Sequence, residues 1–133
     1  MSPLYSALLS WAIQLSGYSL PSGELVVAKV PHETIVQQAC GGRECRVLGF
    51  YPQGGGDVVY IDNQLDPENN TFHASIVVHE MTHWLQGKSG TYGDSCGDSV
   101  EMEREACGVQ QGFLVRYGIH QPVFRGRFGI SCK

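Results

Sequence analysis

The sequence predicts an α+β fold in a single small domain that spans residues 1–133. Helix-like and strand-like segments come in blocks rather than in strict alternation, which favours a short antiparallel or mixed sheet over a doubly wound one. A chain of 133 residues can bury one hydrophobic core but leaves no room for a separate binding module. No repeat, linker or low-complexity segment divides it.

The first part of the chain predicts a helix, a strand and a second, shorter helix. Residues 3–16 carry apolar side chains at helical spacing and are followed by Gly17, so we expect an N-terminal helix there. Residues 24–30 are rich in β-branched side chains, as in a strand. Pro31 then suits the first turn of a short helix that reaches about residue 38.

The remainder predicts a hairpin and two longer helices. Residues 46–51 and 57–62 are strand-like and flank a Pro-Gln-Gly-Gly-Gly segment, which is typical of a turn. A helix is expected at about 71–87 and another at about 99–117. The glycine- and serine-rich stretch 88–98 joins them as a loop.

The expected helix at 71–87 has two distinct faces. Asn70 or Thr71 can cap its start, and Gly87 is a natural stop. Its apolar face is formed by Ala74, Val77, Val78, Met81, Trp84 and Leu85. The opposite side carries Ile76, His79, Glu80 and His83. Such a helix can pack on a core while it presents polar groups to a site.

The motif His79-Glu-Met-Thr-His83 has the spacing of a zinc site. Four residues advance a helix by about 400°, so the two imidazoles lie about 40° apart and roughly 6 Å along the axis, within reach of one ion. Glu80 is rotated by about 100° and lies beside the metal, where it can accept a proton from water. His73 lies about 240° from His79, so we expect a helix-start or surface role for it.

A catalytic zinc ion requires a third protein ligand, and three glutamates follow in the last predicted helix. Glu103 is the favoured ligand, because a carboxylate on a mostly apolar face is costly unless it is paired or bound to metal. Glu105, on a side more exposed to water, is the main alternative, and Glu101 suits the helix start. The residues that share the face of Glu103 are Ala106, Cys107, Gln110, Phe113, Leu114 and Tyr117.

The chain contains five cysteines, Cys40, Cys45, Cys96, Cys107 and Cys132, a count typical of oxidising compartments. We therefore expect an exported protein, periplasmic or secreted, rather than a cytoplasmic one. Cys40 and Cys45 have the spacing of a small disulfide loop, and Cys96 and Cys107 can tie a loop to the following helix. Buried free thiols are the alternative, and the sequence does not establish the pairing.

Composition excludes two classes of partner. The net charge of −4 disfavours nucleic acid, and no segment approaches the roughly 18 consecutive apolar residues of a membrane span. We expect neither DNA nor a membrane span, and the oligomeric state is not indicated.

Two stretches resemble the gluzincin metallopeptidases, which carry HExxH on one helix and a glutamate ligand on the next. They are HisGluMetThrHis at 79–83 and GluArgGluAlaCys at 103–107. The second is similar to the Glu-x-Glu-Ala-Asp segment of some membrane and minimal gluzincins, in which the first glutamate is the ligand. The separation of 20 positions from His83 to Glu103 and the small size also resemble the soluble minigluzincin type. The resemblance covers about residues 57–117 and implies a zincin-like domain.

The resemblance also implies a substrate site, and it leaves two roles open. The strand before the metal helix, Val58 to Ile61, would be an edge that pairs with an extended peptide or protein substrate. Related enzymes often carry an Asp that orients a ligand histidine at the position where this chain has Cys107. Candidate oxyanion stabilisers are Tyr92, Tyr117 and His120, but for each of them a structural role is the favoured interpretation.

The sequence thus predicts a zinc-dependent peptidase. His79, His83 and Glu103 would bind Zn²⁺, and Glu80 would act as the general base. Two alternatives stay open: a non-catalytic, zinc-stabilised interaction domain, and a hydrolase of a non-peptide amide such as one in cell-wall material.

Overall fold

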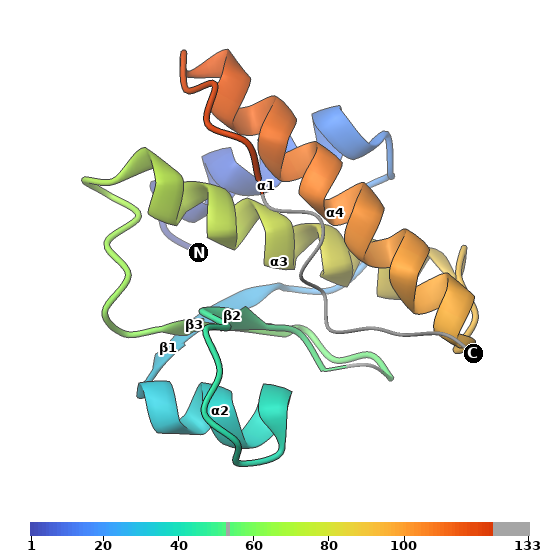
Figure 1. Cartoon of the computed structure of the whole chain (residues 1–133). Helices are drawn as coiled ribbons and strands as arrows, with labels where there is room; N and C mark the ends of the chain where they lie inside the picture. Colours follow the sequence, from blue (N-terminus) through green and yellow to red (C-terminus); the bar gives the residue numbers. More distant parts are fainter. Residues whose placement is uncertain (53, 124–133) are drawn as a thin grey trace.

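A computed structural model describes residues 1–52 and 54–123 and confirms a small α+β domain (Figure 1). Over these residues the chain forms a short mixed sheet and packed helices. The elements in chain order are α1 (Pro3–Ser16), β1 (Val26–Val30), α2 (His32–Cys40), β2 (Gly49–Phe50), β3 (Val58–Asp62), α3 (Thr71–Ser89) and α4 (Cys96–Arg116). The N-terminal helix has the predicted bounds because Ser2 caps its start and Gly17 ends it in the left-handed conformation.

The sheet has the strand order β1-β3-β2. β1 runs parallel to β3, with Val26 opposite Val58, and β2 runs antiparallel to β3, with Gly49 opposite Ile61. β3 is therefore central, and the prediction that residues 58–61 form a free edge is wrong. The physical reason is burial, because β3 carries side chains with no exposed surface, such as Ile61. A strand of this kind lies in the middle of the sheet, and here β1 and β2 pair with it on either side.

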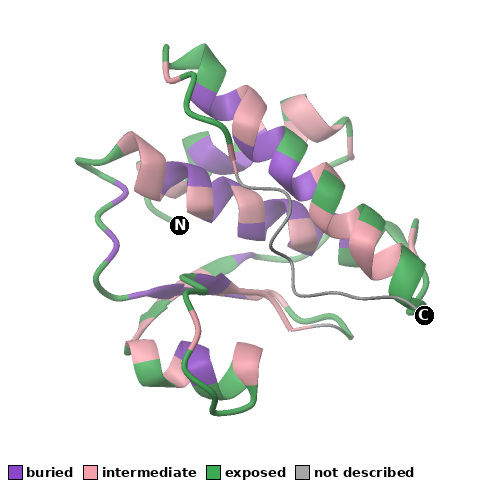
Figure 2. Cartoon of the chain, in the orientation of Figure 1, coloured by how far each residue is buried: buried purple, intermediate pink, exposed green. Residues whose placement is uncertain are grey.

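The helices lie on both faces of the sheet, as Figure 1 shows: α1, α3 and α4 pack together on one face, and α2 lies on the other. Figure 2 shows that the buried residues lie along α3 and α4 and in the strands. The fully buried members of this core include Val59, Ile61, Val77, Val78, Met81, Trp84, Phe113 and Leu114. The apolar face predicted for residues 71–87 is confirmed, because each of its side chains is buried.

Helix α3 continues past the glycine that was expected to end it. It runs through Gly87 and ends at Gly90, which has the left-handed conformation of a helix C-cap. A Cβ atom at position 87 would lie 3.3 Å from the ring of Tyr51. Gly87 thus permits Tyr51 to pack closely on the helix, and the prediction that it stops the helix is wrong.

Two other boundaries differ from the prediction. Helix α4 begins at Cys96, earlier than residue 99, because the Oγ atom of Ser95 accepts a hydrogen bond from the backbone N of Asp98 at 3.0 Å. Of the strand expected at 46–51, only Gly49 and Phe50 pair with β3. The hairpin is therefore present, but its first strand is short.

One predicted disulfide forms and another does not. Cys40 and Cys45 are bonded, as their spacing predicts. Cys107 is a buried free thiol, so its expected pairing with Cys96 is wrong. Both lie in the same helix, 11 residues or about 16 Å apart along its axis, far beyond the reach of a disulfide. Cys132 lies outside the described residues.

Two observations bear on the compartment of the protein. Among the helices of the described chain, none is long and apolar enough to cross a membrane. The Cys40–Cys45 disulfide is compatible with an extracellular location. Export itself stays a prediction.

Candidate metal centre

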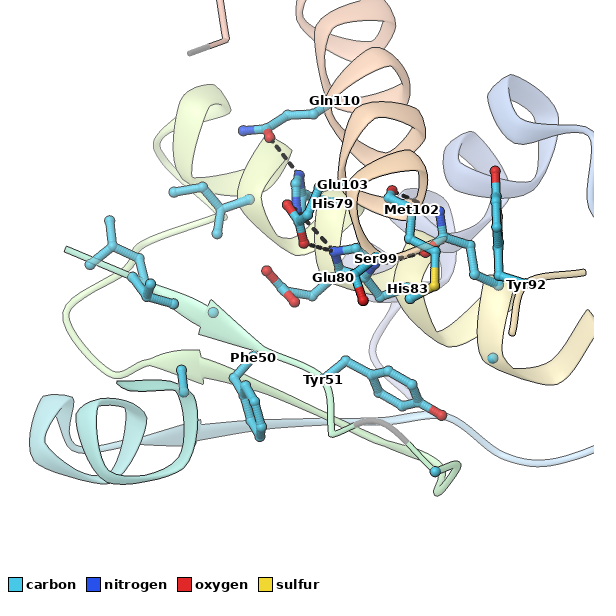
Figure 3. A pocket seen from close by; sticks show the side chains of 18 of the residues that line it. Phe50, Tyr51, His79, Glu80, His83, Tyr92, Ser99, Met102, Glu103 and Gln110 are labelled. Carbon is cyan, nitrogen blue, oxygen red and sulfur yellow. Dashed lines mark hydrogen bonds and ion pairs between the residues drawn. The ribbon is translucent and has the colours of Figure 1, made fainter. Parts of the chain in front are cut away.

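Helices α3 and α4 bring together the three side chains predicted to bind a metal ion. The Nε2 atom of His83 lies 2.6 Å from Oε1 of Glu103, and Nε2 of His79 lies 3.3 Å from Oε2 of the same carboxylate. The two Nε2 atoms lie 3.2 Å from each other. Figure 3 shows the imidazoles of α3 and the carboxylate of α4 converging on one point.

The electrostatics of the cluster favour a carboxylate beside charged imidazole. Burial raises the pKa of Glu103, but hydrogen bonds from His79 and His83 outweigh burial, and the net result is a pKa far below the usual range. Burial disfavours charge on His79, yet its contacts with Cys107 and Glu103 raise the pKa of the imidazole well above its ordinary value. A positive charge is thus stabilised where these side chains meet.

Cys107 contributes a further possible ligand behind this point. Its sulfur and the ligand atoms of His79 and Glu103 lie within 4.8 Å of one another, and this group could hold a metal ion. The thiol is only 2% exposed, however, and it does not line the adjoining cavity, whereas His79, His83 and Glu103 all do. Cys107 therefore lies away from the cavity, and His83 lies on the side that faces it.

Glu80 lies on the same wall of the cavity as the two histidines, as its position in the motif predicts (Figure 3). Its side chain is 8% exposed, and burial raises the pKa of its carboxyl group, an effect that His79 and His83 partly offset. A raised pKa suits a group that accepts and returns a proton near neutral pH. The close approach of β2 confines this side chain, because a Cβ atom at Gly49 would lie 2.7 Å from its Cγ atom.

The cavity in front of these residues has a volume of about 900 Å³. Its floor is formed by α3 and its rim by β2 and Tyr51, while the ring of Phe50 points away from His79 and His83 (Figure 3). Tyr92, the first of the three oxyanion candidates, lines one end. The other two candidates do not line the cavity: Tyr117 is 54% exposed and contacts Trp11 and Phe113, and His120 is exposed.

Two glutamines that the sequence did not single out contact the histidines from behind. Oε1 of Gln110 lies 3.0 Å from Nδ1 of His79, and Oε1 of Gln86 lies 2.7 Å from Nδ1 of His83. Gln110 shares the face of Glu103, and Gln86 lies three residues after His83. A polar residue on an apolar helix face was the one signal that could have identified Gln110.

The other residues weighed as ligands have different partners. Glu105, the alternative ligand, accepts hydrogen bonds from the hydroxyl of Tyr18 at 2.6 Å and from the amide of Gln86 at 2.9 Å, so it lies behind the site and is less exposed to water than expected. Glu101 pairs with Arg104 at the surface. His73 accepts a hydrogen bond from the backbone of Asp66 near the start of α3, in agreement with its predicted structural role.

Comparisons with known proteins do not extend these observations. No protein-family model matches the chain, and neither the curated proteins nor the solved structures contain a significant match. The resemblance to gluzincins therefore stays a prediction that rests on residues 79–83 and 103–107.

Proposed function

We propose that this protein is a zinc-dependent peptidase in which His79, His83 and Glu103 bind the metal ion. The observation that carries the proposal is the convergence of two imidazole Nε2 atoms and one carboxylate within 3.3 Å of each other, with Glu80 beside them on the wall of a cavity. Two imidazoles and a carboxylate are a donor set that zinc prefers at catalytic sites.

The residues fit a catalytic ion better than a structural one. A structural zinc site is closed by four protein ligands, whereas a catalytic site leaves one position to water or substrate. Among the described residues, Cys107 is the additional donor grouped with His79 and Glu103, and its side chain does not line the cavity. The side that faces the cavity is thus left to solvent and substrate.

The chemistry follows from the position of Glu80. When bound, a zinc ion lowers the pKa of a water molecule and polarises a substrate carbonyl. The carboxylate of Glu80 accepts a proton from the attacking water and then delivers it to the leaving amine. Burial keeps the pKa of Glu80 raised, so that the carboxyl group is able to return the proton.

An extended peptide is the substrate that the cavity rim suits. The carbonyl of Leu48 accepts a hydrogen bond from the backbone N of Asp62. Because alternate residues of an antiparallel strand bond to its neighbour, the backbone groups of Gly49 point away from β3, toward the edge of the sheet at which no strand of the described residues pairs. A peptide strand added at that edge would pair with β2 and pass in front of Glu80. We therefore propose that the substrate pairs with β2, in place of the strand predicted at residues 58–61.

Cleavage of a peptide library by the wild type and by Glu80→Gln tests the proposal. Loss of a general base lowers kcat by about 10²- to 10⁴-fold, while bound zinc, measured by metal analysis, should stay at the wild-type level. Glu24→Gln is the matched control, because it removes an exposed carboxylate far from the cavity.

Equal cleavage by Glu80→Gln and the wild type would contradict the mechanism. Stoichiometric zinc without any peptide cleavage would favour the interaction-domain alternative, and turnover of cell-wall amides alone would favour the non-peptide alternative.

A further inference from the structure

We infer that Gln86 and Gln110 are positioning residues that fix the tautomer of His83 and His79, so that Nε2 of each imidazole faces the metal. The inference rests on the proposed zinc site. It concerns the side of each imidazole that faces away from the ion, where the Oε1 atoms of the two amides lie against Nδ1.

The orientation of Gln110 follows from a chain of buried hydrogen bonds. The hydroxyl of Ser75 donates to the backbone oxygen of Phe72 at 2.6 Å, so its single proton is used. The Oγ atom of Ser75 is then free to accept from Nε2 of Gln110, at 3.0 Å. The Oε1 atom of Gln110 therefore faces Nδ1 of His79, and this nitrogen must carry the proton.

Gln86 is oriented by a different set of acceptors. Its Nε2 atom lies 2.9 Å from the backbone oxygen of Met102 and 2.9 Å from Oε1 of Glu105. Neither oxygen can donate, so the amide nitrogen must face them and Oε1 must face Nδ1 of His83. Tyr18 donates to the same oxygen of Glu105 and so fixes the carboxylate in place.

Burial makes these arrangements costly to reverse. Gln86 is 1% exposed and Gln110 is 5% exposed, so bulk water does not readily replace a lost partner. Turning either amide over would set two donors against each other and leave a buried oxygen opposite an acceptor, and such unsatisfied buried groups are strongly disfavoured. The two Nδ1 atoms are thus held as donors, and Nε2 of each imidazole, on the side of Glu103, is the nitrogen left to bind the ion.

A neutral amide orients an imidazole without adding charge to the site. A carboxylate in the same place would also raise the basicity of the ligand. With amides at both Nδ1 atoms, the carboxylates that interact with the two histidines are Glu103 and Glu80. Because the amide of Gln110 orients His79 without carrying a charge, a substitution can change the orientation of the imidazole or the charge beside it separately. The role of Gln110 is therefore testable.

The test compares the zinc dissociation constants of Gln110→Met and Gln110→Glu, measured by competition with a chelator. Both variants lose the amide donor to Ser75, but only the glutamate keeps an oxygen that accepts from His79. Loss of such a partner weakens metal binding by about 10- to 100-fold, so we expect that loss in Gln110→Met and wild-type or tighter binding in Gln110→Glu. Gln14→Met, at an exposed position of α1, is the control.

A purely structural role for Gln110 predicts another pattern. Both variants would then lower the melting temperature, and zinc binding would be unchanged in both or weakened equally in both, which would overturn the inference. The ¹⁵N spectrum of the zinc-loaded wild type gives a second measurement: Nε2 should be the bound nitrogen in His79 and His83, and binding through Nδ1 of either would also overturn it. A wild type that binds no zinc would overturn the proposed function as well.

Discussion

Gly49 sets the position of the proposed general base. Its missing side chain leaves room for Glu80, since a Cβ atom at position 49 would come within 2.7 Å of Cγ and 3.1 Å of the carboxyl carbon. Rotation of the carboxylate about the Cγ–Cδ bond would not relieve the contact with Cγ. The Cγ atom itself would have to move, and the carboxylate would move with it. The chain thus requires a glycine where β2 passes the motif.

Gly49→Ala should therefore impair turnover and leave the metal site intact. A displacement of a catalytic group by about 1 Å lowers activity by about 10²-fold, and the zinc dissociation constant should be unchanged because the three atoms nearest to an added Cβ all belong to Glu80 and none to a proposed ligand. Steady-state kinetics on a cleaved peptide, together with chelator competition, measure both quantities.

Gly108→Ala is the matched control for this substitution. Position 108 lies in α4, and a Cβ atom there would meet nothing within 4 Å. Its peptidase activity should equal that of the wild type, and the helix should gain about 0.5–1 kcal/mol. Unchanged activity in Gly49→Ala would show that β2 does not confine Glu80.

The sequence predicts some residues of the site and not others, for a physical reason. The spacing of His79 and His83 is a property of one helix, and the polar character of Glu103 on an apolar face is a property of another, so both are visible locally. The roles of Gln86 and Gln110 depend on acceptors supplied by other turns and elements, namely Met102 and Ser75. Such contacts exist only after α3 and α4 have packed.

At the scale of elements, His32 joins three parts of the fold. Its Nδ1 atom lies 2.6 Å from Oδ2 of Asp62, at the end of β3, and its Nε2 atom lies 2.9 Å from Oε1 of Glu44, inside the Cys40–Cys45 loop. The hydrogen bond with Glu44 and that with Asp62 raise the pKa of His32 above 6.5. The protonated imidazole thus links α2, the disulfide loop and the sheet.

This link should stabilise the fold in a pH-dependent way. Because the pKa of His32 is raised by folding, its contribution is fully present below the unfolded pKa of about 6.5 and is lost as the pH rises through the folded pKa. The free energy of unfolding, measured in urea, should differ most between the wild type and His32→Gln at about pH 5–6 and converge at higher pH.

His120→Gln serves as the control, because it removes an exposed imidazole outside this cluster. A difference between the wild type and His32→Gln that grows as the pH rises would contradict the assignment.

The sequence predicted where the strands lie along the chain, but it did not predict their order in the sheet. Residues 24–30, 46–51 and 57–62 all carry strand-like patterns, and each contains the strand that the structure shows. Which of them is central depends on pairing between distant segments, and local pattern does not encode it. The same limit explains Gly87, whose role is set by the ring of Tyr51 and not by its neighbours in α3.

At the scale of the whole molecule, the proposed ion joins the two longest helices of the described chain. His79 and His83 belong to α3 and Glu103 to α4, and these helices pack on each other across the core. A metal that binds only the folded chain stabilises it by mass action. The single-domain α+β fold was predictable because composition, length and block order all agree with it.

Removal of the metal should therefore lower thermal stability. At a free zinc concentration about 1,000-fold above the dissociation constant the ion contributes about 4 kcal/mol, so we expect a chelator to lower the melting temperature by about 10 °C or more. The Cys40–Cys45 disulfide is untouched by chelation and does not confuse the comparison. In His83→Ala the chelator should have no effect; a fall as large as in the wild type would place the ion elsewhere.

The zinc content of purified Glu103→Gln and Glu105→Gln shows whether Glu103 is the third metal ligand. The two glutamates lie two positions apart in α4, yet Glu103 meets both histidines while Glu105 contacts Tyr18 and Gln86. We predict one zinc ion per chain in the wild type and in Glu105→Gln, and loss of zinc in Glu103→Gln. Retention of zinc by Glu103→Gln together with its loss from Glu105→Gln, or no zinc in the wild type, would contradict the account.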